Sequence, residues 1–178
     1  MRHPLVFVLS ALCLLLAHPA RAQAISSAYT DLTNCPRDTT HDEDAEEHGS
    51  DAPTDCPGPG GEYRVHEYYS AYGIHRSIDL NAEPSSFSVR LLPTKDECPV
   101  SRYGNKVEWR LKGGKPFAVI QRVTCFEDTG SGPGKRLAEY LVVKGLKGFE
   151  SLDGAVSAKQ KNANEKARAL ADKAAQGR

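Results

Sequence analysis

The stretch that decides the fold is VEWRLKGGKPFAVIQRV, which runs from Val107 to Val123. Apolar and polar residues alternate on both sides of the glycine pair Gly113-Gly114. Alternation with a period of two residues around such a pair is typical of an antiparallel β-hairpin. The returning strand is apolar on both faces, with Ala118 and Ile120 on the second one. We therefore place it inside a sheet rather than at an edge.

The length of the hairpin loop determines which residues face each other across it. A two-residue loop, Gly113-Gly114, would place charged Arg110 opposite Phe117. A three-residue loop that includes Lys115 pairs Leu111 with Phe117 and Trp109 with Val119. Since this register matches apolar with apolar side chains, we predict the three-residue loop.

Further strands and one helix follow from the same kind of pattern. Period-two alternation predicts strands at 63–68, 74–80, 87–91 and 137–143, in addition to the two hairpin strands. Near the C-terminus the apolar residues fall on one stripe of a helix that Asn162 can cap: Ala163, Ala167, Leu170, Ala171 and Ala174. The charged residues predicted to face outward are Lys161, Glu165, Arg168 and Asp172. The fold class expected is α+β, an antiparallel sheet of about six strands with one C-terminal helix packed on it.

The first 22 residues have the features of a cleaved signal peptide. A basic start precedes an apolar run from Leu5 to Ala17, and small residues at Ala20 and Ala22 fit the cleavage rule, as does a second site after Ala24. We expect a soluble mature protein in the periplasm or the medium, without a membrane span. Residues 23–61 are expected to form an acidic, disulfide-pinned loop segment, and residues 62–178 the α+β core of the same domain.

Four cysteines remain after cleavage: Cys35, Cys56, Cys98 and Cys125. In an exported chain an even number of cysteines indicates disulfides. Three pairings are possible, and we favour Cys35 with Cys56 and Cys98 with Cys125, because each closes a loop of a few tens of residues. A zinc site is the competing interpretation, but the chain has no C-x2-C pair.

Charge is distributed unevenly along the chain. Residues 31–56 carry a local charge of −8, and residues 102–178 carry +8. The acidic stretch contains the residues of a candidate divalent-metal site, His41, Asp44, His48 and Asp51. The alternative is a solvated acidic loop, because no EF-hand spacing presets a coordination geometry.

A second candidate site combines aromatic and imidazole rings. Its residues are Tyr68, Tyr69, Tyr72, His66 and His75. Such rings can stack on sugars or contact a protein partner. The alternative is that they cover a sheet face without binding anything. Because Tyr68 and Tyr69 are adjacent, they point to opposite faces of any strand.

Other classes of function find little support in the sequence. The glycine-rich segment 130–136 departs from a phosphate-binding loop in its spacing and lacks the serine or threonine that holds magnesium. No serine lies in a G-x-S-x-G context, and basic residues alternate with acids, which disfavours nucleic-acid binding. We predict no cofactor and no catalytic residue.

The hairpin segments Glu108-Trp109-Arg110-Leu111 and Lys115-Pro116-Phe117-Ala118 resemble those of a group of short exported bacterial proteins of unknown function. The similarity extends to 28–32, to Cys56-Pro57-Gly58 and to the Ala-rich segment 162–172. The members of the group have a cysteine near the position of Gly148, and this chain has no cysteine there. The Cys98–Cys125 pair would therefore be a variation of this chain. The resemblance implies export and a single domain, and it implies no active site.

These observations lead to three hypotheses of function. The first is a non-enzymatic binding or inhibitor-like module that meets an envelope protein or a glycan. The second is a protein that binds a divalent metal through the acidic loop. The third is an envelope hydrolase.

Overall fold

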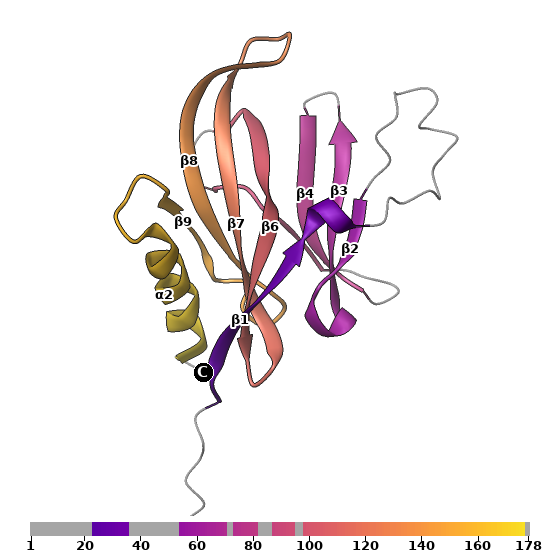
Figure 1. The fold of residues 1–178 in the computed structure, drawn as a ribbon, viewed down its shortest axis with the longest axis vertical. Coiled ribbons are helices and arrows are strands. Elements are labelled where there is room, and N and C mark those ends of the chain that lie inside the picture. Colours follow the sequence, from indigo (N-terminus) through magenta and orange to yellow (C-terminus); the bar gives the residue numbers. More distant parts are fainter. Residues whose placement is uncertain (1–22, 36–53, 71–72, 82–86, 95–97, 177–178) are drawn as a thin grey trace, which may run out of the picture.

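Two antiparallel sheets and one C-terminal helix make up the computed structural model, which describes residues 23–35, 54–70, 73–81, 87–94 and 98–176 (Figure 1). The five-stranded sheet has the order β1 (Ile25–Asp31), β6 (Val100–Lys112), β7 (Lys115–Asp128), β8 (Pro133–Gly145) and β9 (Asp153–Ser157). The four-stranded sheet has the order β2 (Thr54–Pro57), β3 (Tyr63–Ser70), β4 (Gly73–Leu80) and β5 (Ser88–Arg90). Short 3-10 turns, η1 (Leu32–Asn34) and η2 (Pro59–Gly61), follow β1 and β2.

The α+β class is confirmed, but the expectation of a single six-stranded sheet is wrong. All six predicted strands exist, three in each sheet. They divide because β7 is apolar on both faces and each face needs a covering layer. Val119 packs against the four-stranded sheet, whereas Ile120 packs against the helix. The segment 23–61 was expected to be a loop, yet it contributes β1 to one sheet and β2 to the other.

The three-residue loop predicted for the β6–β7 hairpin is wrong, although part of the predicted register is present. Lys112 pairs with Lys115, so the loop has two residues, Gly113 and Gly114. Both glycines have positive φ, 59° and 82°, as the twist of a two-residue hairpin loop requires. Leu111 then pairs with Pro116 rather than with the predicted Phe117, and a register shift beside it restores Trp109 opposite Val119 as predicted.

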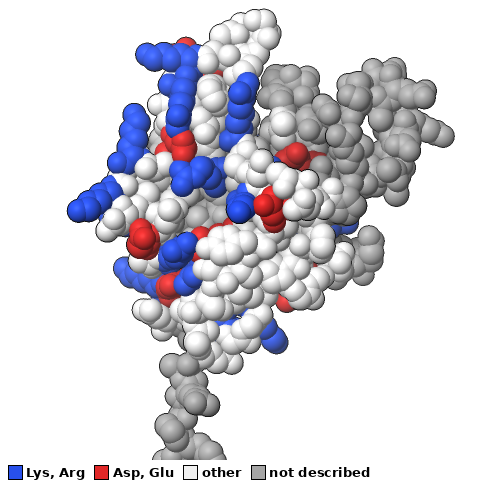
Figure 2. Space-filling view, viewed as in Figure 1, with Lys and Arg blue, Asp and Glu red and all other residues white. Residues whose placement is uncertain are grey.

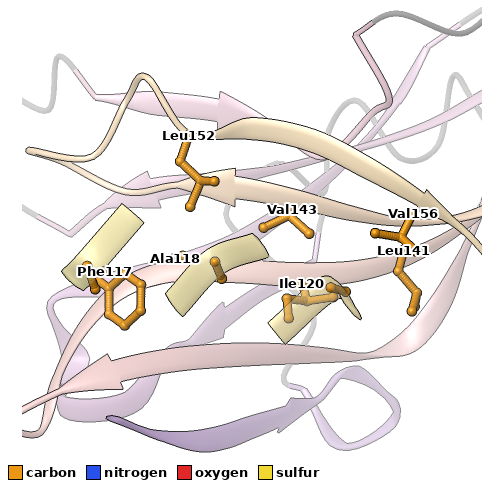
Figure 3. Close-up of a cluster of buried hydrophobic side chains, with 10 residues drawn as sticks. Phe117, Ala118, Ile120, Leu141, Val143, Leu152 and Val156 are labelled. Carbon is orange, nitrogen blue, oxygen red and sulfur yellow. The ribbon is translucent and has the colours of Figure 1, made fainter. Parts of the chain in front are cut away.

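Helix α2 (Ala163–Gln176) covers one face of the five-stranded sheet (Figure 1). Ala167, Ala171 and Ala175 are fully buried against it, and Leu170 is partly buried. Figure 3 shows the sheet side of this core: Phe117, Ala118, Ile120, Leu141, Val143, Leu152 and Val156. The predicted alanine stripe is thus confirmed, and its small side chains let the helix approach the strands closely.

A second core fills the space between the two sheets. Its buried residues come from both sheets and from the chain beyond β8: Cys56, Tyr63, Val65, Ile78, Leu91, Val107, Trp109, Val119 and Leu146. Both predicted disulfides are present, Cys35–Cys56 and Cys98–Cys125, with Cα–Cα distances of 5.4 and 4.8 Å. No helix within the described ranges is long and apolar enough to span a membrane. The predicted signal peptide, 1–22, lies outside those ranges.

Candidate binding surface

Three of the predicted binding residues form one row of rings on the four-stranded sheet. His66 and Tyr68 are two residues apart on β3, and Tyr68 lies directly opposite His75 on β4. The ring centroids of His66 and Tyr68 are 5.7 Å apart, and those of Tyr68 and His75 are 5.2 Å apart, with interplanar angles of 26° and 28°. Val65 and Ile78, which alternate with them, are buried between the sheets. The row therefore lies on the face of this sheet that points away from the five-stranded sheet.

Arg90 of β5 extends this row, and sequence analysis did not identify it. Its guanidinium donates a hydrogen bond of 3.0 Å to Nδ1 of His75. Burial lowers the pKa of His75, and the charge of Arg90 lowers it further. His75 is therefore a neutral hydrogen-bond acceptor at pH 7. We call His66, Tyr68, His75 and Arg90 the ring surface.

The ring surface is partly open to solvent. His66, Tyr68 and His75 are half-buried, and Arg90 is exposed. Because stacked rings cover one another's faces, what they offer a ligand is ring edges, the tyrosine hydroxyl and ring nitrogens. The Nδ1 atom of His66 is buried and has no hydrogen-bond partner within the described part of the chain. A buried polar atom without a partner costs free energy.

The structure describes little of the other predicted site residues. The backbone of Tyr69 lies in β3 opposite Ile74. Tyr72 lies outside the described residues, and so do the candidate metal ligands His41, Asp44, His48 and Asp51, so the metal site stays a prediction. Elsewhere, within the part of the chain that the structure covers, no three His, Cys, Asp or Glu side chains gather as a metal site would require.

Between the two sheets, Arg76 forms a polar cluster with a structural role. Its guanidinium donates to Glu67 at 3.0 Å, to the carbonyl of Gly104 at 2.7 Å and to the side chain of Gln121 at 3.0 Å. It also lies 4.8 Å from the ring centroid of Tyr103. Since Glu67 belongs to one sheet and Gln121 to the other, this buried charge is bonded to both sheets.

A second polar cluster joins the five-stranded sheet to helix α2. Arg110 donates two hydrogen bonds to Asp172, at 2.9 and 2.7 Å, and Arg168 donates two to Glu108, at 2.7 and 3.1 Å. Ser27 donates to Glu108 at 2.6 Å. The prediction that Arg168 and Asp172 face outward is therefore wrong. We call these two ion pairs the helix clip.

The helix clip sets the charge state of its members. Burial raises the pKa of Glu108, but hydrogen bonds from Arg168 and Ser27 and the charges of Arg168 and Arg110 outweigh burial, so that its pKa lies below the usual range. The hydrogen bond to Glu108 in turn raises the pKa of Arg168. The hairpin and helix segments named in the family resemblance are thus bonded to each other in this fold.

The fold and its surface define a two-sheet, disulfide-bonded α+β protein with a partly exposed row of rings. Compared with models of protein families, with curated proteins and with solved structures, the chain matches none. Two disulfides are compatible with an extracellular location.

Proposed function

We propose that the protein is a non-enzymatic binding module that acts after export, in the periplasm or the medium, and recognises an envelope protein or a glycan through the ring surface. The observation that carries this proposal is the continuous row of His66, Tyr68 and His75, with Arg90 bonded to its end. Tyrosine and arginine are the residue types most enriched where partners bind.

The side chains of the ring surface are held in fixed positions, which favours a binding role over one of merely covering the sheet face. Each ring is fixed by its stacked neighbour, and the hydrogen bond to His75 fixes Arg90. A ligand that meets side chains already held in place loses less conformational entropy on binding. The hydroxyl of Tyr68 can donate and accept a hydrogen bond and the guanidinium of Arg90 can donate several, which suits hydroxyl groups of a glycan or the backbone of a protein.

The hydrolase alternative is less favoured by the surroundings of His75. A general base needs a basic ring nitrogen near neutral pH, and nearby cations make protonation harder. The Nδ1 atom of His75 faces the guanidinium of Arg90, and its pKa is lowered. This arrangement suits a hydrogen-bond acceptor better than a proton carrier.

Affinity capture from envelope extract and a glycan array test the proposal. We expect the mature protein to retain a defined set of partners or glycans, and Tyr68→Ala and Arg90→Ala to lose them. Tyr29→Ala is the matched control, since Tyr29 is 55% exposed on the other sheet. A thermal melt of each variant checks that it is folded. Identical profiles for all four proteins would contradict a role for the ring surface.

A further inference from the structure

Among the described residues, helix α2 packs over only one part of its sheet face, and β7 and β8 continue beyond it as an arm. Strand β9 pairs with β8 only as far as Tyr140, and β6 pairs with β7 only as far as Phe126. The β7–β8 hairpin therefore extends beyond its neighbours β6 and β9, as Figure 1 shows. Arg122 pairs with Leu141, which belongs to the core under the helix. Arg122 thus lies on the helix side of the sheet, just beyond that core.

A β-bulge brings a second arginine to the same place. Cys125 pairs with Ala138 and Phe126 pairs with Arg136, which leaves Leu137 without a partner in the ladder. A bulge of this kind turns the following side chains to the other face of the strand. Arg136 accordingly reaches Glu139, which also binds Arg122.

A third arginine lies nearby on β6. Arg102 pairs with Thr124 and lies over the ring of Phe126, 5.2 Å from its centroid. We call Arg102, Arg122, Phe126, Arg136 and Leu137 the arm surface. Glu139 supplies one carboxylate for two of the three guanidinium groups, so the surface keeps a positive charge.

Charged residues of both signs surround the arm surface. The backbone N–H of Ala158 donates to the carbonyl of Glu139, and the exposed Lys159 follows directly. Lysine and arginine side chains gather over the side of the molecule where β8, β9 and α2 lie (Figure 2). Toward the tip, exposed Glu127 and Asp128 oppose this charge, and the Asp128 carboxylate accepts the N–H of Gly130 within the turn.

An exposed leucine accompanies this charge. The side chains of Arg122 and Arg136 are 44% and 57% exposed, and Leu137 is 42% exposed. Within the described residues Leu137 and Tyr29 are the exposed large apolar side chains. A dissolved anion would engage the arginines and gain nothing from the leucine. A membrane surface engages both, since basic side chains meet its phosphates while an apolar side chain enters its headgroup region.

We infer that the arm surface binds anionic phospholipid headgroups at a membrane surface. Guanidinium groups match the geometry of phosphate oxygens, and three of them on one face of the sheet at the base of the arm can reach several headgroups of a plane at once. This binding uses a different sheet from the ring surface and does not depend on the proposed function.

Co-sedimentation of the mature protein with vesicles tests the inference. We expect binding to vesicles of phosphatidylglycerol and phosphatidylcholine, little binding to phosphatidylcholine alone, and weaker binding as salt is added. Arg122→Gln with Arg136→Gln should lower the affinity roughly tenfold or more. Leu137→Ser keeps every charge and should lower it by about threefold.

The matched control removes two positive charges from the opposite end of the molecule. Lys115 follows the β6–β7 turn and Lys173 lies in the last turn of α2, and the bond of Lys112 to the carbonyl of Ala175 places these two ends together. Lys115→Gln with Lys173→Gln should bind vesicles nearly as well as the parent.

Three outcomes would overturn the inference. The first is equal vesicle binding by the arginine variant and the control. The second is equal binding to neutral and anionic vesicles. The third is full release of the protein by millimolar inorganic phosphate together with no effect of Leu137→Ser, which would indicate a site for dissolved phosphate. Thermal melts show whether each variant is folded.

Discussion

Glu108 illustrates how one carboxylate is fixed by its position between two layers. It is 9% exposed, on the sheet face that α2 covers, and it accepts hydrogen bonds from Ser27 and Arg168. A carboxylate in such a place is stable only as long as its cationic partners remain. Its ionisation is therefore coupled to the docking of the helix.

Replacement of Glu108 by Gln should change how stability depends on pH. Because the pKa of Glu108 is lower in the folded than in the unfolded protein, its ionised form adds stability above about pH 4.3, and this is lost as pH falls through the folded-state pKa. At pH 7 Glu108→Gln should cost about 1–3 kcal/mol. Urea unfolding from pH 7 to pH 3 should show the two proteins converging at the acid end, whereas parallel curves would contradict this.

Gly58 is required by a close approach to Trp109. A Cβ atom at this position would lie 2.7 Å from Cη2 of the indole, which is fully buried. Gly58→Ala should therefore destabilise the protein by about 1–3 kcal/mol through overpacking. Combining it with Trp109→Phe removes the contacted ring atoms, so the added cost of the alanine should shrink in that background. An equal cost in both backgrounds, measured by chemical denaturation, would assign the effect to the backbone instead.

At the level of elements, the sequence predicted those strands and helices that are determined by residues close together along the chain. The hairpin and the alanine stripe were predictable because a period of two or 3.6 residues is a local property. The division into two sheets was not, since alternation does not say which strands pair. Of the ring surface, His66, Tyr68 and His75 were predictable. Arg90 was not, because β5 has only three residues and its place beside His75 arises from long-range pairing.

The helix clip was missed for a different reason. A helix pattern places polar residues away from the alanine stripe, and an outward direction is the usual expectation. Here β6 presents Glu108 and Arg110 on the same face that carries the apolar core. Arg168 and Asp172, at the side of the helix, form ion pairs with these two residues. Only the packing of two elements creates these partners.

Double replacement of Arg110 and Asp172 should reveal how strongly the sheet and α2 are coupled. Arg110 is 8% exposed at its side chain, so Asp172→Leu leaves a buried charge without its bidentate partner. We expect each of Arg110→Met and Asp172→Leu to cost about 3 kcal/mol, and the double variant to cost about 1–3 kcal/mol less than the sum. Chemical denaturation of the four proteins gives this coupling energy. Additive losses would mean that the ion pair does not couple the helix to the sheet.

For the whole molecule, the two disulfides restrain different parts of the fold. Cys35 follows β1 and η1, and Cys56 lies in β2, so this bridge ties the five-stranded sheet to the four-stranded one. Cys98 precedes β6, and Cys125 lies in β7 beside the bulge that shapes the arm. One bridge therefore restrains the packing of the sheets, and the other restrains the base of the arm.

Removal of either bridge should cost a similar free energy but loosen a different region. The sequence separations are 21 and 27 residues, so each bridge should contribute about 3 kcal/mol in the loop-entropy model. Hydrogen exchange of a Cys35→Ser, Cys56→Ser variant should speed up in β2 and β3. In a Cys98→Ser, Cys125→Ser variant it should speed up at the arm ends of β6, β7 and β8, and vesicle binding should weaken because the arm surface is less ordered. Matching exchange patterns in the two variants would instead show that the sheets and the arm unfold as one cooperative unit.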